Sequence, residues 1–387
     1  MKVLQVVPSI GAESSGPSYS VPGLCRGLLS VGCDVELHFG GTMPKRQFGY
    51  PVCCYPFSMF PHPRLGRSPS MLIGLKRSIA TADIIHNNSF WMFPNVYPYL
   101  VSKCSSSSVA KLVNAPRGTL AEWSLKHHWL QKRIFGSLCR QYAAMSGTDM
   151  WHATCEKEYE EIRALGYRQP VAIVPIGMDI PEGLNELHGR QSDDRMHRIV
   201  FFGRLHKVKA IENLLLAWSA LCENGFAKDW EVVIAGPDGG VRASLEALVS
   251  EKRLPRVRFV GEINGFAKYE FLSSSDIYVL PSLTENFAVT VAEALACGVP
   301  VIASQGTPWK GLDAERAGRW VLIGATPLAN GLRELMLMSD DERKQMGICG
   351  QKWIGRDFTW NGIGRKMKMA YEWVIGKCDK PEWVKED

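Results

Sequence analysis

The sequence lacks several features that would assign it to a common class of protein at once. No run of apolar residues approaches the roughly 18 that a membrane-spanning helix needs, so we expect no transmembrane segment. The 11 cysteines are odd in number and have no repeated spacing, which argues for reduced thiols in a cytoplasm and against a disulfide framework or a zinc site. No internal repeat, dense basic stripe or nucleic-acid-binding module is visible, so we expect no nucleic-acid partner.

The composition that remains is that of an ordinary globular protein with two domains. The chain has 387 residues, of which 46% are hydrophobic and 22% are charged, enough to bury two cores. The formal net charge is +6, and the first half carries all of it, because residues 1–190 hold 19 Lys and Arg against 13 Asp and Glu. A basic half can indicate an anionic membrane surface, nucleic acid or chance.

The most informative stretch is Pro281–Pro300, PSLTENFAVTVAEALACGVP. It follows an apolar strand expected at Asp276–Leu280, and a helix is expected from Ala288 to Ala296. Strand, loop and helix in this order build the ligand crevice of an open α/β sheet. The N–H groups at such a helix start can bind an anion without a cationic side chain. In this sequence they belong to Phe287, Ala288 and Val289.

Two carboxylates bracket this expected anion site. Glu285 lies in the loop, and Glu293 lies eight residues later in the helix, about 80° away around a helical wheel. We interpret them as contacts for the two ends of an elongated ligand with a diphosphate in the middle, as in a nucleotide sugar. Taken alone, the spacing is more typical of an ordinary strand–helix unit with two surface glutamates.

A second stretch supplies positive charge. A strand expected at Arg198–Phe202 is followed by the loop GRLHKVKA and then by an amphipathic helix at Glu212–Leu221. Negative charge grows on a departing diphosphate as its glycosidic bond breaks, so fixed cations beside it act mainly in the transition state. Arg204 at the strand end and Lys209 at the helix start suit that task.

Together the two stretches resemble the motifs of the retaining GT-B glycosyltransferases of family 4, also called group 1. The first is similar to the E-x7-E motif, although Asn286 and Ala288 stand where glycine is common. The second is similar to G-R-L-x-x-x-K-G, with Ala210 in place of the last glycine. The resemblance implies catalytic roles for Arg204, Lys209 and Glu285. It also implies donor contacts from Gly16, Gly203, Asn286, Phe287, Ala288, Val289 and Glu293.

The resemblance covers nearly the whole chain and implies an α/β fold with two Rossmann-like, doubly wound domains facing a cleft. We expect an acceptor-binding domain at residues 1–183, a linker at 184–197 and a nucleotide-sugar-binding domain at 198–360. A helix within residues 361–387 is expected to cross back to the first domain. The run Val174–Asp179 resembles the family's crossover segment.

The implied activity is transfer of a hexosyl unit from a UDP- or GDP-sugar to a hydroxyl group, with retention at the anomeric carbon. No Asp-x-Asp motif follows a predicted strand, so we expect no cofactor and no required metal. The members that look most like this chain build bacterial surface polysaccharides, such as lipopolysaccharide or exopolysaccharide, on lipid-linked saccharides. The resemblance therefore implies a cytoplasmic enzyme that is peripheral at the inner face of the cytoplasmic membrane.

Three weaker candidates lie in the first half. Gly16 ends a Gly/Ser loop after the first strand, but the loop lacks G-x-G-x-x-G, and a plain turn is the alternative. His86 ends a predicted strand where the family often has a histidine, although a lone histidine there is more often structural. Arg117 follows another strand within Pro-Arg-Gly, where a crevice residue and a plain turn are both open. We expect His86 and Arg117 on the acceptor side.

One basic and aromatic stretch, Trp123–Arg140, is predicted to be helical. Its apolar residues fall near helical spacing, with Lys126, Lys132 and Arg133 around them. One interpretation is a helix packed on its own domain. The other is an interfacial helix that holds the enzyme at an anionic leaflet.

Three rival classes of function remain open at the level of sequence. A sugar-nucleotide 2-epimerase shares the expected fold but forms no new glycoside. A non-catalytic nucleotide-binding protein would bind UDP or GDP without turnover. A nucleic-acid-binding protein would show a steep salt dependence that nucleotide does not compete away.

Overall fold

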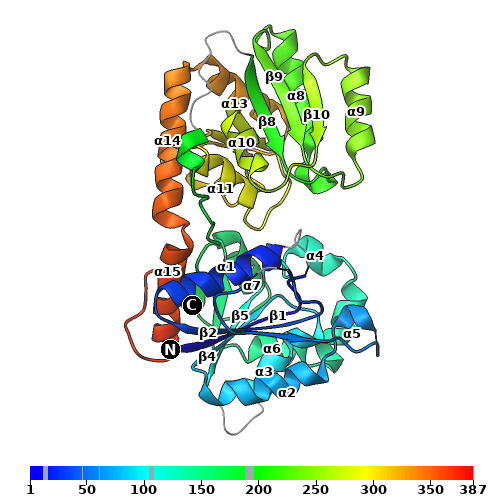
Figure 1. The fold of residues 1–387 in the computed structure, drawn as a ribbon. Coiled ribbons are helices and arrows are strands. Elements are labelled where there is room, and N and C mark those ends of the chain that lie inside the picture. Colours follow the sequence, from blue (N-terminus) through cyan, green and yellow to red (C-terminus); the bar gives the residue numbers. More distant parts are fainter. Residues whose placement is uncertain (12–15, 46, 61, 104–108, 188–195, 387) are drawn as a thin grey trace. The chain divides into compact units, whose positions relative to one another are not determined.

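Two compact units make up the protein in a computed structural model (Figure 1). The structure describes residues 1–11, 16–45, 47–60, 62–103, 109–187 and 196–386. Unit 1 comprises Met1–Asp179 and Phe358–Asp387, and unit 2 comprises Ile180–Asp357. These bounds differ from the expected ones, because residues 180–183 belong to unit 2 and residues 358–360 to unit 1. Residues 188–195 of the expected linker lie outside the described residues.

Unit 1 contains an eight-stranded sheet in the order β14-β7-β6-β5-β4-β1-β2-β3. Every neighbouring pair is parallel except β14 with β7. The order of strands reverses between β1 and β4, which is the switch point at which open α/β sheets bind ligands. The strands are β1 (Lys2–Val7), β2 (Asp34–Gly40), β3 (Val52–Tyr55), β4 (Ile84–Asn88), β5 (Lys111–Ala115), β6 (Met150–Ala153), β7 (Val171–Ile173) and β14 (Val384–Lys385).

The helices of unit 1 cover both faces of this sheet, with α1 and α15 on one side and α2 and α3 on the other (Figure 1). The helix predicted over Trp123–Arg140 is in fact two helices, because His128 between them has a left-handed backbone with φ of 55°. The helices are α1 (Gly16–Ser30), α2 (Pro69–Ser78), α3 (Tyr97–Lys103), α4 (Glu122–Lys126), α5 (Trp129–Leu138), α6 (Gln141–Ser146), α7 (Glu156–Ala164) and α15 (Trp360–Val374).

Unit 2 contains a six-stranded, fully parallel sheet in the order β10-β9-β8-β11-β12-β13. Its switch point lies between β8 and β11. The strands are β8 (His197–Phe202), β9 (Trp230–Ala235), β10 (Val257–Gly261), β11 (Ile277–Leu280), β12 (Val301–Ser304) and β13 (Gly318–Val321). The helices are α8 (Ile211–Glu223), α9 (Arg242–Glu251), α10 (Ala267–Ser273), α11 (Val289–Ala296), α12 (Gly311–Ala314), α13 (Ala325–Leu337) and α14 (Asp340–Asp357).

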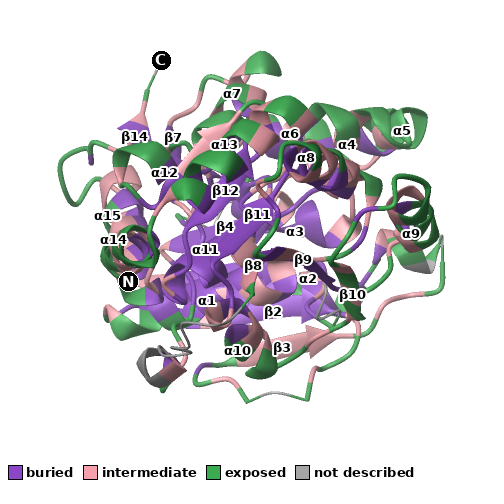
Figure 2. Ribbon diagram, turned by 90° about the horizontal axis from the view of Figure 1, so that it is seen from above, coloured by how far each residue is buried: buried purple, intermediate pink, exposed green. Residues whose placement is uncertain are grey.

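The cores follow from this layering. Strands buried on both faces read as continuous apolar runs, and residues 3–7, 277–280 and 301–303 are accordingly buried throughout. Figure 2 shows the same for the central strands β4 and β11, which are coloured as buried. The α/β class with two Rossmann-like domains, predicted from the sequence, is thus confirmed.

The described residues also bear on membrane and thiol chemistry. Among them, no helix combines the length and the hydropathy needed to cross a bilayer. Ten cysteines are described, and each is a free thiol.

Helix α15 completes unit 1 although it lies far from the other helices in sequence. It packs on α1, and the two helices cross where Gly27 of α1 faces Gly364 of α15, so that no side chain separates the backbones at this point. A Cβ atom on Gly27 would overlap the carbonyl oxygen of Trp360, and one on Gly364 would overlap the carbonyl oxygen of Gly27. The two backbones can approach this closely only because both positions are glycine.

The variant Gly27→Ala is therefore expected to destabilise the protein by about 1–3 kcal/mol, the range for overpacking a close contact. The measurement is the free energy of unfolding in denaturant. Gly355→Ala is the matched control, because Gly355 also lies in a helix but has open space around it. The control should be neutral or stabilise by up to about 1 kcal/mol. Equal stability of the two variants would contradict the close crossing.

Candidate functional site

The residues that the sequence predicts for donor binding in unit 2 follow two neighbouring strands, β8 and β11. Gly203 and Arg204 come directly after β8, and Glu285 lies in the loop after β11. The neighbouring strand β9 also approaches here, since a Cβ on Gly236 would overlap the carbonyl oxygen of Gly203. The parallel strands end at one edge of the sheet, so the switch point brings the cations and the carboxylate of the two motifs to the same edge.

Backbone hydrogen bonds join the loops at this edge. The N–H of Leu283 donates to the carbonyl of Val208 (2.8 Å), which links the loop after β11 to the loop after β8. The N–H of Glu285 donates to the carbonyl of Gly306 (2.8 Å), in the loop after β12. The hydroxyl of Ser304 donates to the carbonyl of Ser282. Three loops therefore hold one another in place around Glu285.

An ion pair joins two of the predicted catalytic residues. The ammonium nitrogen of Lys209 lies 2.6 Å from Oε1 of Glu285, and the hydroxyl of Ser282 donates to the same oxygen at 2.7 Å. Both charged side chains are mostly buried, with 19% of Lys209 and 14% of Glu285 exposed. A lysine ammonium has three donors, so Lys209 retains donors for a further anion while Glu285 holds it in position.

Two alanines take the backbone conformation of glycine beside this pair. Ala210 precedes α8 with φ of 45°, and Ala288 precedes α11 with φ of 62°. A residue with a Cβ in this left-handed region costs about 1–2 kcal/mol. At both positions glycine is common in the family motif. The chain keeps the left-handed backbone conformation there with alanine and so carries backbone strain.

The start of α11 has the features of an anion site. Its first N–H groups have no partner inside the helix, and Ala288 and Val289 lie at this end. The preceding Phe287 is fixed from behind, because the indole N–H of Trp309 donates to its carbonyl (2.6 Å) and the two rings lie 5.3 Å apart. Asn286 is half-buried in the same loop.

Glu293 is buried in α11, where its carboxylate is paired with Lys268 of α10. Only 8% of the Glu293 side chain is exposed. Burial raises the pKa of this carboxyl above its usual value, and the positive charge of Lys268 opposes that rise. The ammonium of Lys268 also lies 4.7 Å from the ring centroid of Tyr269. Lys268 therefore holds the Glu293 carboxyl in place and favours its ionised form.

Arg204 differs from the other predicted catalytic residues because its side chain is exposed. The described part of the chain offers it no ion pair, so its charge is not compensated within unit 2. Its side chain lies against Gly239, in the loop after β9, and an uncompensated guanidinium is suited to bind phosphate by paired N–H groups.

In unit 1 the structure places His86 inside the protein. Its ring has no exposed surface, and its Nδ1 lies 2.6 Å from the hydroxyl of Tyr371 and 3.2 Å from the amide nitrogen of Gln5. The ring of His152 lies 5.2 Å away, and burial lowers the pKa of His152 to about 3 and that of His86 well below its usual value. Both rings are therefore neutral near pH 7. The complete burial of His86 agrees with the structural alternative that the sequence left open and does not expose the ring to an acceptor.

Arg117 and Gly16 lie closer to the surface of unit 1. The guanidinium of Arg117 donates twice to the side-chain oxygen of Asn88, at 3.1 and 3.0 Å, and this joins the ends of β5 and β4. Arg117 has φ of 53°, as in a turn, and is half-buried. Its role as a crevice residue stays a prediction. Gly16 is exposed as the first residue of α1, and residues 12–15 of its loop lie outside the described residues.

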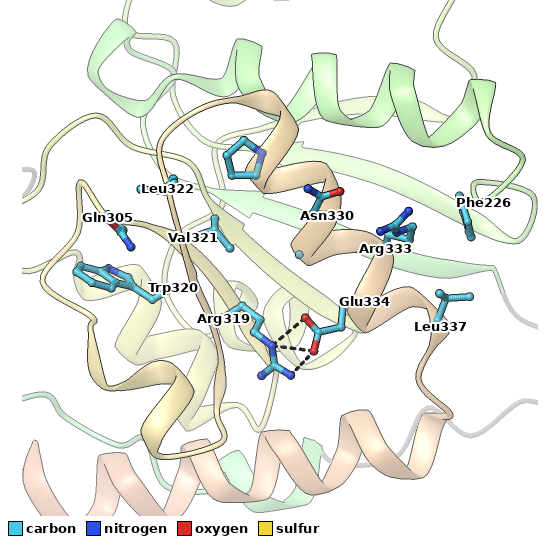
Figure 3. Close-up of a pocket in the computed structure, with 12 residues that line it drawn as sticks. Phe226, Gln305, Arg319, Trp320, Val321, Leu322, Asn330, Arg333, Glu334 and Leu337 are labelled. Atoms are coloured by element: carbon cyan, nitrogen blue, oxygen red, sulfur yellow. Dashed lines mark hydrogen bonds and ion pairs between the residues drawn. The ribbon is translucent and has the colours of Figure 1, made fainter.

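A hollow in the surface of unit 2 lies away from these motifs. Figure 3 shows it between β13 and α13, with Arg319 and Glu334 paired at 3.0 Å and with Phe226, Leu322 and Leu337 around it. It contains none of the predicted site residues. Of its two arginines, Arg319 is paired with Glu334, and Arg333 lies over the ring of Phe226 (6.0 Å to the centroid). Because neither sequence motif reaches this hollow, we do not place the donor there.

One cluster of possible metal ligands also lies outside the motifs. Glu36, His38 and Cys53 of β2 and β3 bring their ligand atoms within 4.8 Å of one another. The Glu36 carboxylate already interacts with His38 Nε2 (3.0 Å), the Ser78 hydroxyl (2.8 Å) and the Lys2 ammonium (3.4 Å). The hydrogen bond from His38 is the main reason that its pKa is lowered to about 2. These three partners are enough to compensate the charge of the Glu36 carboxylate, so its position does not call for a metal ion.

Sequence reasoning did not find Lys268, Ser282 or the buried partners of His86. Ser282 adjoins the motif and could have been included, since a hydroxyl three residues before Glu285 is within reach in a tight loop. Lys268 lies 25 residues before Glu293, and its helix carries no spacing that marks a ligand. Tyr371 lies 285 residues after His86.

Comparison with known proteins shows what this chain is similar to. Residues 188–353, almost all of unit 2, match the family model described as glycosyl transferases group 1. Over its whole length the chain is similar in fold to sucrose-phosphate synthase from Thermosynechococcus elongatus (TM-score 0.73, 19% identity, 97% of this chain and 100% of the other). It is also similar to Anabaena HepE, solved with UDP and glucose (TM-score 0.67, 17% identity, 96% and 99%). The fold is thus GT-B.

The curated relatives are glycosyltransferases by name. A D-inositol 3-phosphate glycosyltransferase of Corynebacterium diphtheriae is 30% identical over 45% of this chain and 42% of the relative. An uncharacterized glycosyltransferase of Methanocaldococcus jannaschii is 37% identical over 48% and 46%. A GDP-mannose-dependent mannosyltransferase of Mycobacterium tuberculosis that acts on phosphatidylinositol dimannoside is 24% identical over 64% and 69%. The alignments with the first two relatives span less than half of either of them.

Proposed function

We propose that this protein is a retaining hexosyltransferase that moves a sugar from UDP or GDP to a hydroxyl of a saccharide acceptor. The observation that carries the proposal is the ion pair of Lys209 with Glu285 at the switch point of unit 2, beside the start of α11. The class of unit 2 and the UDP and GDP-mannose named for its relatives support the choice of donor. The assignment to family 4 rests on the motifs alone.

In the proposed binding mode the diphosphate lies against the first N–H groups of α11, with Arg204 and Lys209 as its cations. Glu293, buried on the same helix, accepts hydrogen bonds from the hydroxyls of the ribose. Glu285 contacts the transferred sugar and also orients Lys209. Each end of the donor then meets one carboxylate of the E-x7-E motif, as the sequence predicts.

In the proposed reaction the bond between the anomeric carbon and the phosphate oxygen breaks while the acceptor oxygen bonds to that carbon on the same face. The acceptor proton passes to the departing phosphate oxygen, so no protein base is needed. Arg204 and Lys209 stabilise the charge that grows on the diphosphate. Holding donor and acceptor together supplies the remainder of the rate enhancement.

The acceptor that we propose is a lipid-linked saccharide of bacterial surface polysaccharide synthesis, met at the inner face of the cytoplasmic membrane. Two names among the similar proteins support it. One relative acts on a phosphatidylinositol mannoside, and one similar structure, WaaG, is a glycosyltransferase of lipopolysaccharide biosynthesis. A 2-epimerase with the same site is distinguished by its product, because it would release an epimerised sugar and form no glycoside.

Arg204→Ala is expected to lower kcat on the order of 10²–10³-fold, the usual loss when one transition-state donor is removed. Its stability should hardly change, because the side chain is exposed. Lys209→Ala should lose similar activity and also stability, since it leaves Glu285 partly buried without its partner. Lys207→Ala, an exposed lysine two residues away, is the control and should keep full activity. Full activity of Arg204→Ala would rule out the placement of the diphosphate.

Donor affinity should fall as pH decreases through the raised pKa of Glu293, because a protonated carboxyl loses acceptor capacity. The measurement is the Kd of a UDP- or GDP-sugar, whose diphosphate does not titrate in this range, from pH 8 to 5. Glu293→Gln should bind weakly and without this pH dependence. Lys268→Met should move the loss of affinity to higher pH, while Lys252→Met, an exposed lysine of unit 2, should not. An identical pH profile in Lys268→Met would disprove the role of the pair.

Treatment with EDTA is expected to leave turnover unchanged, because the diphosphate is held by helix N–H groups and two cations. The assay is initial rate with a saturating donor, before and after removal of metal. Activity that disappears and returns with Mg²⁺ or Mn²⁺ would refute this expectation.

A further inference from the structure

Helix α5 of unit 1 exposes apolar side chains that a core helix would bury. Within it only Phe135 and Gly136 are buried. Phe135 packs edge-on against Phe93 with ring centroids 5.4 Å apart, and a Cβ on Gly136 would overlap the ring of Tyr142. These two residues attach α5 to the unit, so its opposite face is left free.

The free face carries a continuous apolar strip. Leu130, Ile134 and Leu138 are spaced by four residues and therefore line one side of the helix. Their exposed fractions are 54%, 51% and 78%, and that of the neighbouring Trp129 is 58%. Figure 2 shows α5 coloured mainly as exposed. Helix α5 therefore packs on its own domain through one face, as one of the two interpretations expects, and the opposite apolar face is what the interfacial interpretation requires.

Positive charge adjoins the strip. Arg133 lies between Trp129 and Ser137 on the same exposed side, and Arg140 is exposed just beyond the helix end. Lys132, in contrast, points inward, since its ammonium donates to the carbonyl of Ser124 and lies 5.8 Å from the ring centroid of Trp91. The helix itself contains no acidic residue. An apolar strip bordered by tryptophan and arginine is the composition of a helix that lies in the interface of an anionic bilayer.

We propose that Leu130, Ile134 and Leu138 insert into an anionic lipid bilayer, with Trp129 and Arg133 at the level of the headgroups. We call this set the α5 surface. The inference deepens the proposed function and rests on it for its purpose, because docking would bring the enzyme to a lipid-linked acceptor. The docking itself requires no turnover, so it can be measured separately.

The test is co-sedimentation of the full chain with vesicles of phosphatidylglycerol or of phosphatidylcholine. Wild type should bind the anionic vesicles at low salt and be released as salt screens the charge. The triple change Leu130→Gln, Ile134→Gln and Leu138→Gln should weaken binding at least about tenfold. Arg133→Glu should weaken binding to phosphatidylglycerol but hardly alter the weaker binding to phosphatidylcholine.

The matched control is a triple change of equally exposed apolar residues in unit 2, namely Leu322, Ile323 and Leu337, each to Gln. It should bind vesicles like wild type, and thermal unfolding should show all variants folded. Failure of wild type to bind anionic vesicles, or equal loss in the control, would overturn the proposal. So would a lipid-free dimer of wild type that the α5 triple variant abolishes, because the strip would then be a self-association surface. Donor binding, measured on the same samples, reports on the proposed function independently.

Discussion

The ion pair between Lys209 and Glu285 connects the ends of β8 and β11, and the rest of the candidate site depends on that connection. It lies at the switch point, where the loops after neighbouring strands diverge to opposite faces of the sheet. Hydrogen bonds from Leu283 to Val208 and from Glu285 to Gly306 hold the loops in register. A cation, a carboxylate and a helix start are thereby fixed at one edge, which is what electrostatic stabilisation of a leaving group requires.

Backbone strain and buried charge accompany this arrangement. Ala210 and Ala288 remain left-handed without being glycine, and the carboxyl of Glu293 is buried beside the ammonium of Lys268. Backbone strain and buried charge of this kind lower the stability of the folded state and are typical of functional sites. The packing of the surrounding unit offsets their cost in free energy. Unit 1 also has buried polar side chains at its switch point. Gln5, His86 and Tyr371 form a hydrogen-bonded network between β1, β4 and α15.

Much of the fold and of the unit 2 site could be predicted from the sequence, because their signals are local. Each motif loop follows its apolar strand directly in the sequence. The loop Gly203–Ala210 follows β8, and the loop Pro281–Ala288 follows β11. The edge strands β3 and β13 were not predicted, since they are short and only partly buried. Lys268 and Tyr371 reach their partners only through tertiary packing, which no spacing in the sequence records.

The central claim is that a nucleotide diphosphate sugar binds at the start of α11, between Glu285 and Glu293. Hydrogen–deuterium exchange of the whole protein, with and without a UDP- or GDP-sugar, tests it most directly. The account predicts slower exchange of the backbone amides of Phe287–Thr290 and of the loop Gly203–Ala210 when the donor binds. Protection confined to the hollow between β13 and α13, or no protection in unit 2 at saturating donor, would contradict it.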